Sequence, residues 1–227
     1  MKKILDTLKL KWAEYLLEVV VIVIGILGAF ALNNWNDQRV TLKQKQVYIS
    51  SLKSDLLRDV QSIMQTLEIQ TADQMNIEAL ANDLSNPKIS FKESVGLIMN
   101  FNRAIVSLRE FNTSTFDALI STGKIDILNN ELINAIRNLS RAQNQFLDVD
   151  GSLIELYRSK QVELPWKNSI INSGPLFDEI KKDISVRDLM KFNDHITLKR
   201  QVYRHSINAL NDILSQTQQV LVLLDES

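Results

Sequence analysis

The sequence has few of the residues that interrupt helices or cross-link chains: it contains no cysteine, three prolines and six glycines in 227 residues. The absence of cysteine excludes disulfide bonds and is compatible with either an oxidising or a reducing compartment. With so few helix breakers, and with apolar residues recurring every three or four positions, the chain is predicted to be nearly all helical.

The sequence also lacks an excess of charge of one sign. Lys and Arg number 26 against 27 Asp and Glu, and the two signs are interspersed without a basic stripe. Proteins that bind nucleic acid normally use such a stripe to contact phosphates, so nucleic acid is not an expected partner. No Ser-His-Asp order and no carboxylate dyad is present. We therefore predict no catalytic, cofactor-binding or metal-binding residues, and the sequence alone assigns no molecular activity.

One long apolar run lies near the N-terminus. It extends from Val19 to Leu32 without a polar residue, and Tyr15, Leu16 and Leu17 lengthen it past the single Glu18. As one helix, residues 15–32 span roughly 27 Å, close to the ~30 Å of a bilayer core. The sequence predicts a transmembrane helix over 15–32, preceded by a basic amphipathic cytoplasmic or interfacial segment over 1–14. The aromatic side chains expected at the two membrane interfaces are Trp12, Tyr15 and Trp35.

Two alternatives remain for this run. A signal peptide would be cleaved after Ala29-Phe30-Ala31, which fits the small-x-small pattern, although the acidic residues of the preceding segment are unusual in a cleaved leader. A buried core helix of a soluble protein is the other alternative. The anchor is favoured because nothing else in the chain is as uniformly apolar.

The flanking charges predict the orientation of the span. Four lysines precede it and three basic residues follow it closely, namely Lys2, Lys3, Lys9 and Lys11 against Arg39, Lys43 and Lys45. The positive-inside rule then places the N-terminus in the cytoplasm and the C-terminal domain in the periplasm of a bacterial inner-membrane protein.

Residues 33–227 are predicted to form one helical domain. Its expected helices cover about 37–85, 91–110, 114–122, 131–164 and 176–225. Ser90 and Glu93 form a capping-box pattern at the start of the second helix, and Gly123 is a natural left-handed stop after the third. Short connections between long amphipathic helices favour an elongated antiparallel arrangement resembling a four-helix bundle. In that arrangement the last helix returns towards the membrane, and Trp166 lies in a loop against the bundle or lipid.

Three motifs that resemble binding sites are better explained by structure. Asp148-Val-Asp150-Gly151 resembles the middle of a calcium loop, but the first and twelfth ligand positions hold Phe146 and Tyr157. Ser121-Thr-Gly-Lys124 resembles part of a phosphate loop but lacks its first glycine, so a helix stop is predicted instead. His195 and His205 lie ten residues apart on one helix and cannot share a metal ion, so both are expected at surface or boundary positions.

Two features inside the apolar run have functional interpretations. Gly25 and Ala29 are four residues apart and Gly28 extends the same smooth region, so a second membrane helix can approach closely there. Glu18 is an ionisable group at the edge of the membrane, where such groups are often functional, but it can also reach the interface. The expected partners are accordingly the lipid bilayer and either a second copy of the chain or another membrane protein.

Two stretches of the sequence are similar to a known kind of protein. The run from Glu18 to Asn36 (EVVVIVIGILGAFALNNWN), followed by a long charged helix and by Ser114 to Ile125 (STFDALISTGKI), resembles an uncharacterised family of N-terminally anchored, helical bacterial membrane proteins. The resemblance implies an intact anchor and a helical extracytoplasmic domain, and it brings no activity, ligand or catalytic residue.

The preferred interpretation is a single-pass membrane protein whose helical domain serves interaction, as a scaffold, assembly partner or envelope component. An extracytoplasmic sensor of a small ligand that signals through a partner is the first alternative, and an enzyme with an unrecognised site is the second. A polar-lined cavity would favour the sensor, an exposed apolar face or small-residue seam the scaffold, and converging titratable groups the enzyme.

Overall fold

The computed structural model describes residues 2–161, 163, 174, 179 and 182–227, and the regular elements among them are all helices. These are α1 (Lys2–Leu84), α2 (Phe91–Asn100), α3 (Ser114–Ser121), the short 3₁₀ helix η1 (Ile125–Ile127), α4 (Asn130–Gln161) and α6 (Val186–Asp225). The all-helical prediction is therefore confirmed for this part of the chain. Trp166 lies outside the described residues.

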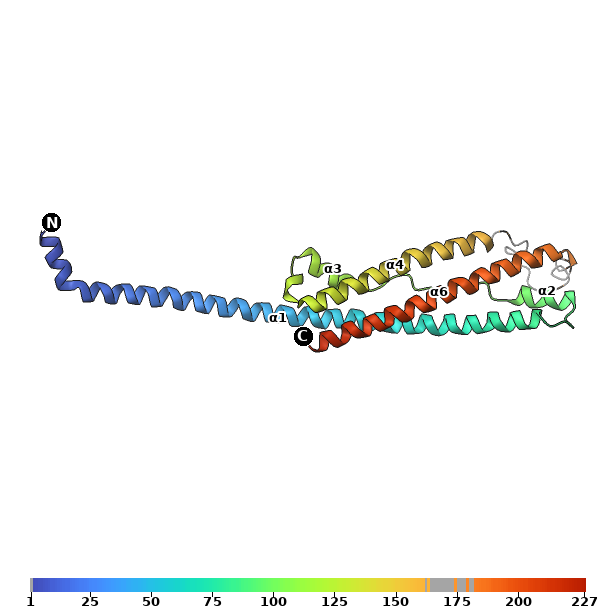
Figure 1. The fold of residues 1–227 in the computed structure, drawn as a ribbon, viewed down its shortest axis with the longest axis horizontal. Coiled ribbons are helices and arrows are strands. Elements are labelled where there is room, and N and C mark those ends of the chain that lie inside the picture. Colours follow the sequence, from blue (N-terminus) through green and yellow to red (C-terminus); the bar gives the residue numbers. More distant parts are fainter. Residues whose placement is uncertain (1, 162, 164–173, 175–178, 180–181) are drawn as a thin grey trace. The chain divides into compact units, whose positions relative to one another are not determined.

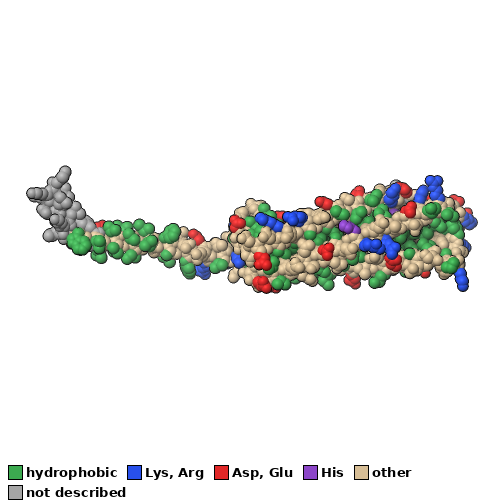
Figure 2. All heavy atoms as spheres, in the orientation of Figure 1, with side chains coloured by type: hydrophobic (Ala, Val, Ile, Leu, Met, Phe, Trp, Pro, Cys, Tyr) green, Lys and Arg blue, Asp and Glu red, His purple; other side chains and the backbone are tan. Residues whose placement is uncertain are grey.

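The chain divides into two compact units within α1. Unit 1 covers residues 1–50 and unit 2 covers residues 51–227. The division differs from the boundary at residue 33 that hydropathy suggested, because α1 continues as a regular helix beyond the apolar run before its residues are packed against other helices. In unit 1, every side chain from Leu16 to Lys43 is exposed, and Figure 2 shows hydrophobic side chains along the visible face of this helix.

Unit 2 is built around three long helices that lie side by side, namely residues 51–84 of α1, α4 and α6 (Figure 1). Lys53, near the start of the α1 part of unit 2, forms an ion pair of 2.5 Å with Asp225 at the end of α6. Glu78, further along α1, forms an ion pair of 2.5 Å with Arg200, nearer the start of α6. Residue numbers thus rise along α1 as they fall along α6. The antiparallel return of the last helix is confirmed.

The apolar residues that recur every three or four positions form the core of unit 2. In α1 these positions form a buried apolar stripe in which a few buried polar residues are interspersed, and burial of such a stripe is the main source of stability for a helical bundle. The buried members from α1 are Leu52, Leu56, Ile63, Ile77 and Leu80, joined by Leu132, Ile136, Leu139 and Phe146 of α4 and by Phe192, Val202, Leu210 and Ile213 of α6.

Several helix ends in unit 2 are set by capping residues that can be identified in the sequence. Ser90 and Glu93 form the expected capping box at the start of α2, and Ser185 and Asp188 form a second one at the start of α6. Gly123 has a φ of +66°, the left-handed conformation predicted for it, and it ends α3. Each of these groups satisfies or redirects backbone atoms that a helix end leaves without partners.

The predicted second helix is wrong beyond residue 100. α2 ends at Asn100, and residues 101–113 form an extended segment, here called the strap, that leads to α3. Its apolar residues Phe101, Ile105 and Leu108 have helical spacing, but the first two pack into the core from an extended backbone. Two other bounds also differ. α4 ends at Gln161 rather than 164, and α6 begins at Val186 rather than 176, with half of the stretch 176–185 outside the described residues.

Candidate functional site

Buried polar side chains from α1, α4 and α6 surround the strap. They occupy positions on the mostly apolar, core-facing sides of these helices, and all are almost fully buried: Asp55, Asp59, Gln70, Gln143, Asp150, Lys199, Tyr203 and Ser206, with Tyr157 beside them. An extended segment packed against helices has no helix or sheet ladder for its amide and carbonyl groups, so side chains bind those groups that face the helices. This cluster is the most concentrated polar site in the described part of the chain.

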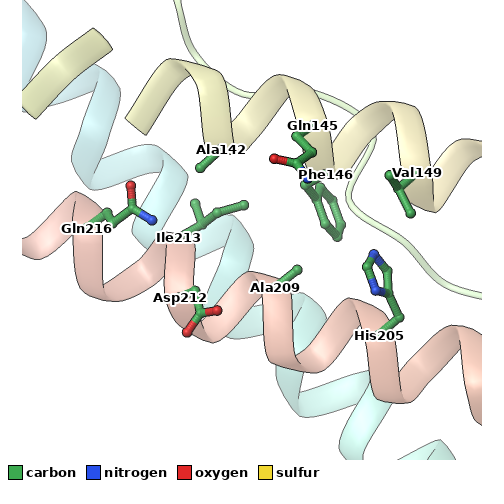
Figure 3. Close-up of a pocket in the computed structure, with 9 residues that line it drawn as sticks. All are labelled: Ala142, Gln145, Phe146, Val149, His205, Ala209, Asp212, Ile213 and Gln216. Atoms are coloured by element: carbon green, nitrogen blue, oxygen red, sulfur yellow. The ribbon is translucent and has the colours of Figure 1, made fainter. Parts of the chain in front are cut away.

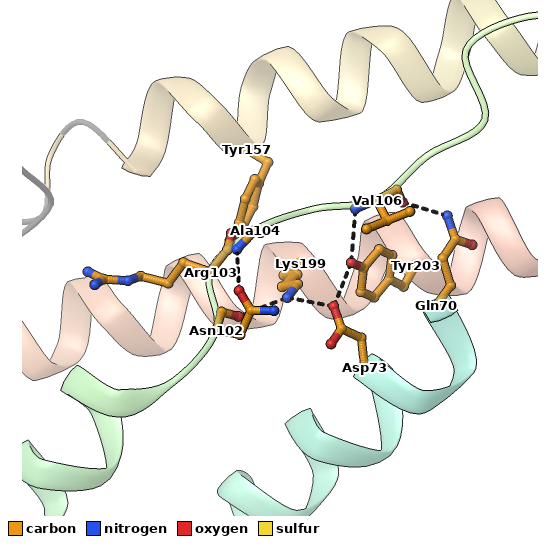
Figure 4. A network of polar contacts seen from close by, with 9 residues as sticks. All are labelled: Gln70, Asp73, Asn102, Arg103, Ala104, Val106, Tyr157, Lys199 and Tyr203. Atoms are coloured by element: carbon orange, nitrogen blue, oxygen red, sulfur yellow. Dashed lines mark hydrogen bonds and ion pairs between the residues drawn. The ribbon is translucent and has the colours of Figure 1, made fainter. Parts of the chain in front are cut away.

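Lys199 and Tyr157 hold the first residues of the strap (Figure 4). The Lys199 ammonium, with no exposed surface, donates to the Asn102 carbonyl at 2.9 Å and to Asp73 Oδ2 at 3.1 Å. The Tyr157 hydroxyl donates to the Arg103 carbonyl at 2.6 Å. Two consecutive carbonyls of the strap are therefore bound by two different helices.

Tyr203 and Gln70 hold the middle of the strap at Val106. The Val106 amide donates to the Tyr203 hydroxyl at 3.2 Å, and the Val106 carbonyl accepts from Gln70 Nε2 at 2.9 Å. The Tyr203 hydroxyl donates in turn to Asp73 Oδ2 at 2.8 Å, the same oxygen that Lys199 contacts. Asp73 thus accepts from both side chains and fixes their orientation.

Three carboxylates hold the remainder of the strap and the start of α3. Ser107 Oγ donates to Asp150, the Asn112 amide donates to Asp59 at 2.9 Å, and Thr115 donates to Asp55 through its backbone at 3.2 Å and its hydroxyl at 2.5 Å. Phe111 also packs edge-on against Phe146 of α4, with ring centroids 6.1 Å apart. The strap is therefore fastened along its length by polar groups and near its end by an aromatic pair.

The environment raises the pKa of two of these carboxyl groups and lowers the pKa of the third. Burial raises the pKa of Asp59 above its ordinary value, and the hydrogen bonds from Asn112 and Gln143 only partly offset it. Burial likewise raises the pKa of Asp150. Burial also opposes ionisation of Asp55, but hydrogen bonds from Thr115 and Arg58 outweigh it and lower the pKa of that carboxyl.

His195 lies in the same cluster with only 2% of its surface exposed. Its ring stacks on the Tyr157 ring at a centroid distance of 4.1 Å, and neither of its nitrogens has a hydrogen-bond partner. Burial, with Arg103 and Lys199 nearby, lowers the pKa of His195 from 6.5 to about 4, so the ring is neutral at pH 7. The expectation of a surface or boundary histidine is wrong for His195, because position along a helix does not reveal which side chains the strap covers.

A shallow hollow of about 220 Å³ lies on another face, between α4 and α6 (Figure 3). The small side chains of Ala142 and Ala209 leave it open above Phe146 and Ile213, and its polar members are Gln145, His205, Asp212 and Gln216. His205 is exposed, as expected. No group of three metal-ligating side chains lies together among the described residues.

The residues predicted at the membrane lie in unit 1. Trp12 and Trp35 are exposed, with the Arg39 guanidinium 5.9 Å from the centre of the Trp35 ring, while the Tyr15 side chain lies outside the described residues. Glu18 and Ala29 are exposed, and a Cβ added at Gly25 or Gly28 would meet no atom within 4 Å. Within the described part of the chain, no other side chain therefore covers the helix surface at Gly25 and Gly28. The roles assigned to all seven residues stay predictions.

The two other motifs have structural roles. Asp148 to Gly151 lies inside α4 rather than in a loop, and Asp150 binds Ser107 of the strap. Ser121 to Lys124 ends α3, with the Gly123 amide bonded to the Ile120 carbonyl and the Lys124 amide to the Leu119 carbonyl. The helix stop predicted for this second motif is confirmed.

The sequence contained a signal for the cluster. Asp59, Gln70 and Asp73 fall on the apolar stripe of α1, and Gln143 and Asp150 interrupt the seam of α4. Polar residues at core positions are uncommon unless partners bind them. The sequence did not identify those partners, because the strap is 36 residues from Gln70 and 97 from Lys199 along the chain.

Comparison with known proteins gives a family without an assigned role. The model of the Family of unknown function (DUF6090) matches residues 18–207. No curated protein and no solved structure matches the chain. The matched range covers most of the apolar run, the whole strap and every residue of the polar cluster.

Proposed function

This chain belongs to the Family of unknown function (DUF6090), and we propose that it is a membrane-anchored helical interaction module. Residues 15–32 cross a bacterial inner membrane in this proposal, with the N-terminus in the cytoplasm and unit 2 in the periplasm. Unit 2 serves as a scaffold or assembly partner.

The apolar run with exposed side chains is the observation that carries the proposal. Its most apolar 18-residue window has a mean hydropathy of 2.5, and none of that window is buried. Twelve Leu, Ile, Val and Phe side chains at about −0.3 to −0.6 kcal/mol each favour insertion by roughly 4–7 kcal/mol, more than one boundary carboxylate opposes. An unbroken helix also satisfies its own backbone groups, as lipid requires.

The core-helix alternative is less favourable for the same reason. A soluble protein would cover such a run with its own side chains, whereas the window here has no buried residue. A cleaved signal peptide passes the same test of hydropathy, so the proposal depends on the run remaining in the mature chain.

The polar cluster is explained by contacts within the chain. Its hydrogen-bonding groups converge on the backbone of the strap, which accounts for their burial without a substrate. The hollow between α4 and α6 is smaller than the 300–1,000 Å³ that is typical of ligand sites. Two larger hollows, of about 350 Å³ beside Ser107 and Asp150 and of about 510 Å³ beside Asn86 and Gly96, are open to solvent. None of these observations favours an enzyme or a sensor over a scaffold.

Fractionation tests the anchor. Wild-type protein is expected in the membrane pellet after a carbonate wash, at its full-length mass. The double variant I22D/I26D is expected in the soluble or aggregated fraction, because two charges at the centre of the run cost about 5–7 kcal/mol. Val40→Asp, at an exposed apolar site on α1 outside the run, is the matched control and is expected to stay in the membrane. Full-length protein that is soluble without detergent, or a mature chain that begins at Leu32, would overturn the anchor.

Cysteine labelling tests the orientation. The chain has no cysteine, so a single Ser227→Cys variant reports one position. A membrane-impermeant maleimide is expected to label it in intact spheroplasts, with Lys2→Cys unlabelled until the membrane is broken. The reverse pattern would place unit 2 in the cytoplasm.

Affinity purification of detergent-solubilised protein, with light scattering and mass spectrometry, tests the interaction role. We expect a stable oligomer or a defined partner. Recovery as a monomer alone, from cells cross-linked before lysis, would count against the scaffold.

A further inference from the structure

His195 lies beside the two side chains that bind the first carbonyls of the strap, Tyr157 and Lys199. Its ring stacks on Tyr157, whose hydroxyl binds the Arg103 carbonyl, and Lys199, one helical turn further along α6, binds the Asn102 carbonyl. Both nitrogens of this buried histidine lack hydrogen-bond partners. The ring therefore packs with the groups that fasten the strap and is itself held only by stacking and burial.

We propose that His195 is an acid-sensitive latch: its protonation releases residues 101–106 of the strap from α4 and α6. The proposal is independent of the membrane anchor, because all the groups that carry it lie in unit 2.

The charges around His195 oppose a third positive charge. Arg103 faces it from the strap and Lys199 from its own helix, and the α4 neighbour is the neutral Tyr157. Asp73 of α1 contributes one carboxylate, which already binds Lys199 and Tyr203. Among the described residues, the two cations Arg103 and Lys199 thus oppose protonation of the ring, while the Asp73 carboxylate is bonded to Lys199 and Tyr203.

Burial opposes the charge further. An imidazolium has two N–H donors, and an unpaired donor in a buried site costs as much as a lost hydrogen bond. Water can hydrate the ring only where the packing over it opens. Since Arg103 belongs to the strap and has a buried guanidinium nitrogen without a partner, the first residues of the strap are the part expected to move.

The size of the effect follows from linkage. With a pKa of about 4 in the closed state and 6.5 in the open state, opening becomes about 30-fold more favourable at pH 5.0 than at pH 7.5. Hydrogen exchange of full-length protein in detergent, followed by mass spectrometry of peptides that cover 101–106, measures this opening. Labelling times are corrected for the slower intrinsic exchange in acid, and peptides from the middle of α4 serve as an internal reference.

The chain has two histidines, which provides a matched pair of variants. His205→Phe, at an exposed position of the same helix, is expected to behave as wild type. His195→Phe retains an aromatic ring on Tyr157 but cannot be protonated, so its strap is expected to stay protected at pH 5.0. Unchanged protection in the wild type, or equal loss in both variants, would overturn the latch.

A measurement on an unaltered His195 covers the case in which His195→Phe does not fold. In the His205→Phe protein, isotopically labelled histidine gives one imidazole signal. We expect its titration midpoint near pH 4, or cooperative with strap release. A midpoint at or above 6 with the strap still protected would overturn the proposal.

Discussion

The buried ion pair between Lys199 and Asp73 offers the strongest test of the polar cluster. Lys199 has no exposed surface, and its ammonium binds both Asp73 and the Asn102 carbonyl. Lys199→Met keeps the length and apolar stem but removes both hydrogen bonds and leaves the carbonyl unpaired. Charge-assisted bonds contribute about 1.5–3 kcal/mol each, and rehydration of the partly exposed Asp73 offsets part of the loss. We expect a loss of about 3 kcal/mol in the free energy of unfolding.

Urea unfolding followed by circular dichroism, on full-length protein in detergent, measures this loss. Asp73→Asn is expected to cost about 3–5 kcal/mol, because it leaves a buried ammonium without its counter-charge. The double variant K199M/D73N is expected to cost at least about 1 kcal/mol less than the sum of the two single variants, since each single change leaves a partner unpaired. Lys92→Met, on the exposed surface of α2, is the control and is expected to change stability by less than about 0.5 kcal/mol. A loss below about 1 kcal/mol for Lys199→Met, or strict additivity, would refute the argument that this pair fastens the strap.

Three further predictions concern single positions and use the same unfolding measurement. Burial raises the pKa of Asp150, so the folded state binds its proton more readily than the unfolded chain, and this group's contribution to stability falls as pH rises through the raised pKa. Asp150→Asn keeps an acceptor for Ser107 and is expected to be as stable as wild type, or more stable, at pH 7. A loss above about 1 kcal/mol would contradict this. Gly151→Ala, in the interior of α4 with open space where a Cβ would lie, is expected to raise stability by about 0.5–1 kcal/mol. Gly123→Ala, at a φ of +66°, is expected to lower stability by about 1–2 kcal/mol. Changes of the same sign would contradict the different backbone conformations assigned to the two glycines. Ser185→Ala removes the cap of α6 and is expected to cost about 1 kcal/mol, with no loss indicating that the capping box contributes nothing.

The local parts of the fold could be predicted because they depend on neighbouring residues. The Ser90 and Glu93 capping box and the Gly123 stop require only a few adjacent side chains, and the stripe through Leu52 and Ile63 requires only a period. The structure confirms these features.

The strap could not be predicted in this way. Phe101, Ile105 and Leu108 have the spacing of a helix face, and local preference gives no reason to end the helix at Asn100. The extended backbone is stable because Gln70, Tyr157, Lys199 and Tyr203 bind it from three other helices. Such long-range compensation overrides a local pattern, and single-sequence reasoning detects it only as polar residues that interrupt an apolar seam.

The ion pair between Lys53 and Asp225 has a consequence for biosynthesis. These residues are 172 positions apart, and the strap depends on Lys199 and Tyr203, each of which is bonded to a strap residue 97 positions earlier in the chain. A nascent chain whose α6 has not yet emerged from the ribosome therefore contains the strap but lacks Lys199 and Tyr203, two of the side chains that bind it. Contacts of such long range favour slow, late assembly. Ribosome-bound intermediates are expected to hold residues 101–113 in a protease-sensitive form until α6 has emerged.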